Sequence, residues 1–115
     1  MINSINPSTG KLIQEYNIYS DKEILSIIDK VSDEYNTWKE VSFKERSSVL
    51  HAIADALDKN IEEHAKMISL EIGKPIVESR MEVEKCVWVL QYFADNAEEF
   101  SKNETIKTGY KESYV

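Results

Sequence analysis

The stretch from Pro75 to about Phe100 constrains the fold most, because it carries two apolar stripes at helical spacing. At about 100° per residue the stripes lie well apart, with Arg80, Glu84 and Gln91 between them. The first stripe is Ile76, Val83, Val87, Leu90, Ala94 and Ala97, and the second is Val77, Met81, Trp88 and Tyr92. A helix that is apolar on two sides needs cover on two sides. We expect the preceding helices to cover one side and expect the second layer to lie outside these 115 residues.

Three further helices are predicted upstream, each with a start signal and an apolar face. Ser20 with Glu23, and Ser42 with Glu45, form the capping-box pattern. Asn60 is predicted to cap the third helix, and Gly73 to end it in the left-handed conformation. Pro75 suits the first turn of the fourth helix. The apolar faces are, in order, Ile24, Ile28, Val31, Tyr35 and Trp38; Val49, Leu50, Ile53, Ala54 and Leu57; and Ile61, Ala65 and Ile68, with Ile72 near the end.

The two ends of the chain are predicted to be extended. Ile2 to Ile5 and Leu12 to Tyr19 flank a loop at residues 6–10 whose proline and glycine favour a tight turn, so residues 1–19 are predicted to form a β-hairpin. Residues 101–109 are polar, and Tyr110 to Val115 resembles the start of a strand. The predicted fold class is mainly α: an antiparallel layer of four helices over residues 20–100, with an N-terminal hairpin and a loop and strand start at 101–115. Only three Gly and two Pro fit this helical class.

Composition excludes several kinds of partner and compartment. The net charge is −7 and no basic patch occurs, so nucleic acid and anionic membranes are not expected as partners. No apolar run approaches the roughly 20 residues that span a bilayer. The N-terminus lacks the basic start and apolar run of a signal peptide, and Cys86 is the sole cysteine. We therefore predict a cytoplasmic protein.

No residue in the chain is predicted to be catalytic, cofactor-binding or metal-binding. His51 and His64 lie on different predicted helices, and neither has ligands at a metal-binding spacing. Cys86 has no helix N-terminus or facing cation to activate it, so we interpret it as a packed or half-buried thiol. Gly10 and Gly73 are single glycines rather than a phosphate-binding loop. The carboxylates Glu71, Glu78, Glu82 and Glu84 are interpreted as solubilising charges, and Trp38, Trp88 and Tyr92 as core or interface residues.

Five motifs nevertheless resemble the aldehyde dehydrogenase superfamily when taken in order. They are residues 5–11; Trp38 with Glu45, Arg46, Leu50, Ile53, Ala54 and Leu57; residues 70–75; residues 82–88; and residues 113–115. Residues 82–88 and 113–115 are most similar to bacterial succinate-semialdehyde dehydrogenases. Each motif alone is weak, but together they cover essentially the whole chain.

The resemblance implies oxidation of an aldehyde, succinate semialdehyde in this subgroup, to its acid with NAD or NADP. It implies that a cysteine attacks the aldehyde, a glutamate activates water, and an asparagine with a backbone N–H holds the oxyanion. All of these lie downstream of the motifs seen here; Cys86 and Glu71 do not match them, and the chain resembles the N-terminal helical layer of the NAD(P)-binding domain. We therefore expect this chain alone to be inactive, to bind no cofactor, and to self-associate or bind the remainder of the enzyme. The alternative is a non-catalytic helical protein-interaction module.

Overall fold

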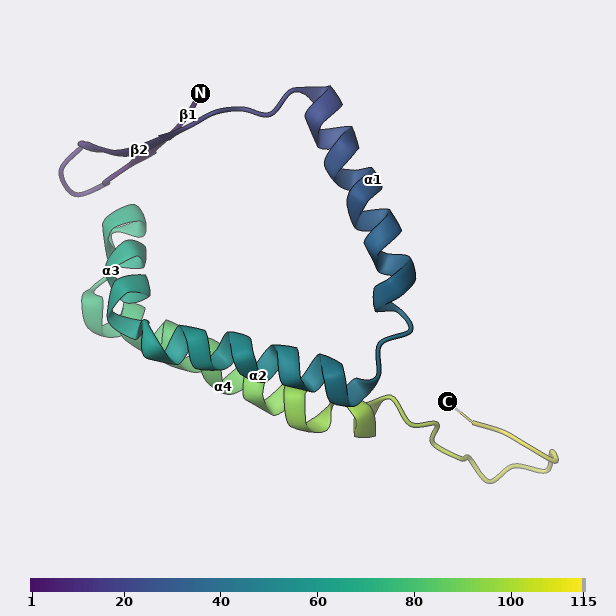
Figure 1. Ribbon diagram of the computed structural model, residues 1–115. Coiled ribbons are helices and arrows are strands. Elements are labelled where there is room, and N and C mark those ends of the chain that lie inside the picture. Colours follow the sequence, from purple (N-terminus) through teal and green to yellow (C-terminus); the bar gives the residue numbers. More distant parts are fainter. Residues whose placement is uncertain (115) are drawn as a thin grey trace.

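The computed structural model describes residues 1–114 and contains two strands followed by four helices (Figure 1). The strands are β1 (Ile2–Ile5) and β2 (Leu12–Tyr16), and the helices are α1 (Asp21–Trp38), α2 (Phe43–Lys59), α3 (Ile61–Ile72) and α4 (Ile76–Phe100). The mainly helical class with a small N-terminal sheet is thus confirmed.

The hairpin has the predicted position but a shorter second strand. β1 and β2 pair antiparallel, with Ile2 opposite Tyr16 and an irregularity between Ser4 and Ile5. In the loop, the Asn6 Oδ1 accepts hydrogen bonds from the backbone N–H groups of Ser8 and Thr9 at 2.9 and 3.2 Å. This side-chain turn forms the corner, and Gly10 at a φ of 68° completes it. Pairing ends at Tyr16 because its partner, Ile2, is the first residue of β1.

Both predicted capping boxes are present. In α1 the Ser20 side chain accepts from the N–H of Glu23, and the Glu23 carboxylate accepts from the N–H of Ser20 at 2.8 Å. In α2, Ser42 and Glu45 make the same exchange. Hydrogen bonds from the serine, first the hydroxyl and then the backbone, lower the pKa of each glutamate. Each box therefore satisfies two backbone N–H donors at the start of a helix. Its hydrogen bonds also favour the charged form of the glutamate.

At the start of α3 the prediction was wrong. The Asn60 side chain makes no capping hydrogen bond. Its Nδ2 donates instead to the carbonyl of Ala56 at 2.8 Å, so it serves the end of α2. The backbone of Asn60, at φ −121° and ψ 24°, is not the extended conformation that the capping residues Ser20 and Ser42 adopt, so its side chain does not cap α3. Gly73 takes the left-handed conformation predicted for it, with a φ of 76°, and Pro75 stands just before α4 rather than inside its first turn.

The packed part of the molecule is the layer formed by α2, α3 and α4. α4 runs back along α2 and packs on both preceding helices (Figure 1). Ala54 of α2, Ala65 of α3, and Val83, Val87 and Ser79 of α4 are the buried residues there. Two alanines and a serine at these positions let the helix backbones approach closely. The first predicted stripe of α4 therefore supplies the core, as expected.

α1 does not join this layer, contrary to the expectation that the first three helices together cover α4. Every residue of α1 is exposed, and the ribbon of α1 stands away from the other helices (Figure 1). The turn at residues 39–42, where the Val41 N–H donates to the Trp38 carbonyl, sends α1 away from α2. A periodic apolar face indicates that a helix packs against something, but it does not indicate which element covers it.

The shape of the chain is extended rather than globular. Its radius of gyration is 20.6 Å and its extents are 66 × 40 × 27 Å. A compact domain of about 100 residues has a radius of gyration of about 13 Å. Within residues 1–114 the buried apolar side chains are only Ala54, Ala65, Val83 and Val87. The chain therefore leaves most of its apolar surface uncovered.

The C-terminal segment forms a small loop rather than a strand over the predicted range. Thr105 and Tyr114 make an isolated antiparallel bridge, and the Ile106 N–H donates to the Ser113 carbonyl at 2.8 Å. The backbone bends at residues 109–111, so the strand predicted from Tyr110 is wrong at its start. The last predicted strand residue, Val115, lies outside the described residues.

Candidate functional site

An apolar groove lies between α3 and α4, with Leu57 of α2 at one end of its lining. Its volume is about 870 Å³. The residues that line it are Leu57, His64, Met67, Ile68, Glu71, Ile72, Glu82, Val83, Lys85, Cys86, Val89 and Leu90. The groove is apolar along its floor and carries charged groups at its edge, which is the character of a packing surface for another apolar element.

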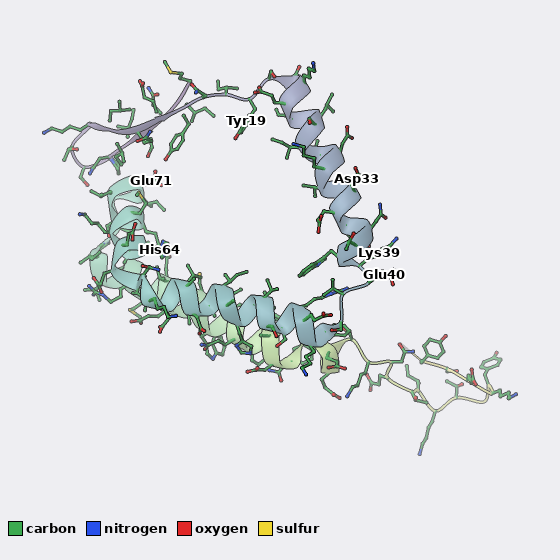
Figure 2. The ribbon with its side chains drawn as sticks, viewed as in Figure 1. Tyr19, Asp33, Lys39, Glu40, His64 and Glu71 are labelled. Atoms are coloured by element: carbon green, nitrogen blue, oxygen red, sulfur yellow. The ribbon has the colours of Figure 1, made fainter. Side chains whose placement is uncertain are left out.

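The two histidines are not brought together. His64 lies on α3 beside the groove (Figure 2), whereas His51 of α2 has its Nε2 3.0 Å from the Oδ1 of Asp95 on α4. The structure thus places His51 in a contact between two helices. Across residues 1–114, no three His, Cys, Asp or Glu side chains gather in a way that could hold a metal ion.

Cys86 lines the groove and is exposed, so its interpretation as a packed or half-buried thiol was wrong. It lies in the middle of α4, far from the positive end of that helix, as the sequence indicated. Within the groove, Lys85 is its neighbour in sequence and points about 100° away. The geometry therefore supplies no activating group for this thiol in the described part of the chain.

Two of the glutamates noted in the sequence have structural partners. Glu71 accepts a hydrogen bond from the Ser4 hydroxyl at 2.5 Å, which ties the hairpin to the end of α3. Glu82 forms an ion pair with Lys74. In Figure 2 Glu71 lies at the end of α3 that faces the hairpin. These carboxylates act in the corner between α3 and α4 as fixed charges.

An ion pair between Arg80 and Glu62 joins α4 to α3. Arg80 donates from Nε and Nη2 to the two carboxylate oxygens of Glu62 at 2.5 and 3.0 Å. The hydrogen bond from Arg80 lowers the pKa of Glu62, and the same bond raises the pKa of Arg80. A bidentate ion pair of this kind fixes the relative orientation of the two side chains in addition to attracting their charges.

The groove does not fit the phosphates of a dinucleotide. Dinucleotides are held by backbone N–H groups of glycine-rich turns at a helix N-terminus. The groove is instead lined mainly by apolar helix side chains, with Glu71, Glu82 and Lys85 among them. We therefore assign it no cofactor contact.

The second stripe of α4 forms an exposed surface, here called the Trp88 face: Val77, Met81, Trp88 and Tyr92. Trp88 is 60% exposed and Met81 61%. The ring of Tyr92 lies 5.8 Å from that of Trp88 and 5.9 Å from that of Phe100, and Phe93 joins the same cluster. These exposed aromatic rings, in contact with one another, form a continuous apolar surface. The sequence indicated the stripe but not its extension to Phe93 and Phe100.

One contact between α1 and α2 could not be predicted from the sequence. Arg46 of α2 reaches back to the end of α1, where its Nη2 donates to the carbonyls of Trp38 and Lys39 at 3.2 and 2.9 Å. In the sequence, Arg46 stood out only as one residue of the second family motif, with Trp38 and Glu45. No spacing rule predicts a contact between an arginine and carbonyls seven and eight residues earlier in a different helix.

Comparison with known proteins identifies the family. The model of the aldehyde dehydrogenase family matches residues 1–115. The chain therefore belongs to the aldehyde dehydrogenase family. Among the described residues no helix has the length and apolar character needed to cross a membrane.

Similar curated proteins include succinate-semialdehyde dehydrogenases. A probable succinate-semialdehyde dehydrogenase (NADP⁺) of Synechocystis sp. is 32% identical over 114 residues, which are 99% of this chain and 25% of the relative. A succinate-semialdehyde dehydrogenase (NADP⁺) of Mycobacterium tuberculosis is 31% identical over 97 residues, 84% of this chain and 21% of the relative. The chain thus spans about a quarter of the length of these relatives.

Solved structures show the same fold within longer chains. The succinic semialdehyde dehydrogenase of Streptococcus pyogenes, in complex with NADP⁺, matches 97% of this chain and 25% of its own, with a TM-score of 0.89 and 24% identity. The glyceraldehyde-3-phosphate dehydrogenase of Methanocaldococcus jannaschii, complexed with NADP, matches 99% of this chain and 25% of its own. The TM-score is 0.87 and the identity is 25%. The separation of α1 from the helical layer is therefore part of a recurrent arrangement.

Proposed function

We propose that this chain is the N-terminal part of the NAD(P)-binding domain of an NAD(P)-dependent aldehyde dehydrogenase that oxidises succinate semialdehyde to the carboxylic acid. The observation that carries the proposal is the 32% identity with the Synechocystis relative along 99% of the chain. The names of the relatives favour NADP over NAD. A cytoplasmic location stays a prediction.

Within that enzyme, the chain would act as a helical layer rather than as a source of catalytic groups. Its core is small and the Trp88 face is uncovered, so the layer is suited to packing against other parts of a larger protein. Burying a large side chain fully contributes roughly 1.5–3 kcal/mol. Several such contributions are available on the Trp88 face. We propose that the remainder of the enzyme covers this face, and that copies of the isolated chain cover it by self-association.

A graft tests the proposed activity. Residues 1–115 would replace the aligned residues of the Synechocystis enzyme, and NADP⁺ reduction would be followed with succinate semialdehyde and with acetaldehyde. We expect the chimera to oxidise succinate semialdehyde within about tenfold of the parent's kcat/KM, a penalty of about 1.4 kcal/mol that imperfect packing at a grafted boundary can account for. A chimera that folds and binds NADP⁺ but does not turn over would contradict the proposal.

A second experiment tests whether the isolated chain catalyses the reaction by itself. The purified 115-residue chain, with NAD⁺ or NADP⁺ and succinate semialdehyde, should give no turnover, because nucleophilic attack and positioning need groups that we do not assign to it. Cys86→Ser should leave this result, and the rate of the chimera, unchanged. Turnover by the isolated chain that the Cys86→Ser change abolishes would show that Cys86 is a nucleophile.

A further inference from the structure

We draw no further inference here: the strongest candidate, the apolar groove between α3 and α4 whose lining includes Met67, Cys86 and Val89, is an uncovered apolar face, and nothing in the structure shows what covers it.

Discussion

Pro7 lies directly against Gly73: its Cγ is 3.0 Å from the position that a Cβ on Gly73 would occupy. The hairpin tip therefore contacts the end of α3 at Gly73, where the absence of a side chain leaves room for Pro7. Gly73 also has a φ of 76°, a conformation that side chains rarely adopt. Two independent requirements, one conformational and one steric, thus meet at the same glycine and dock the hairpin at the α3–α4 corner.

Gly73→Ala should destabilise the chain by more than the conformational cost alone. Left-handed backbone costs a residue with a Cβ about 1–2 kcal/mol, and the new methyl group would press on Pro7. Gly10→Ala is the control, since Gly10 has a φ of 68° but nothing within 4 Å of its added Cβ. Urea unfolding followed by circular dichroism measures both. Equal losses in the two variants would show that the Pro7 contact contributes nothing.

Val87→Ala should weaken the helical layer by about 1–3 kcal/mol, because it removes buried methyl groups and leaves a cavity. Val87 is 7% exposed between α2 and α4. Val31→Ala makes the identical change on α1, at a side chain that is 64% exposed, and should cost less than about 0.5 kcal/mol. Comparable costs at the two sites would mean that α1 is covered in solution by an element that packs on it.

Stability should fall as the pH drops below the ordinary carboxylate range, and the capping boxes should contribute to the fall. The folded-state pKa of Glu23 and that of Glu45 both lie below the ordinary 4.5, because each carboxylate accepts hydrogen bonds from a serine. A lowered folded pKa gives stability that is fully present above the ordinary value of 4.5 and is lost as the pH falls through the folded value. Helix content measured from about pH 7 to about pH 2 should therefore decrease less steeply in a Glu23→Gln, Glu45→Gln double variant. A steeper decrease in that variant would contradict the assignment.

The isolated chain should self-associate through the Trp88 face. Trp88, Met81 and their neighbours leave an apolar surface exposed on a chain with a small core. Light scattering across a concentration series should show growth in mass for the wild type, reduced by Trp88→Arg. Tyr110→Arg changes another exposed aromatic residue, outside this face, and should have no effect. A wild-type chain that stays monomeric at every concentration would rule the prediction out.

Local patterns along the chain determine much of this fold. The capping boxes at Ser20 and Ser42, the left-handed Gly73 and the two stripes of α4 all follow from interactions within a few residues of one another. Such interactions depend only on residues that are neighbours in the chain, so they can be predicted from the sequence. The family, too, follows from the sequence, because its motifs occur in order along the chain.

Tertiary structure alone decided the contacts between elements distant in sequence. The hydrogen bonds from Arg46 to the carbonyls of Trp38 and Lys39, and the bond from Ser4 to Glu71, join residues that no local pattern in the sequence brings together. Asn60 shows the same limit: the sequence did not determine whether its side chain bonds to the helix before it or to the helix after it, and in the structure it donates to the Ala56 carbonyl of α2. A periodic sequence specifies that an apolar face needs a partner. The partner is set by three-dimensional geometry, and for the Trp88 face we place it outside these 115 residues.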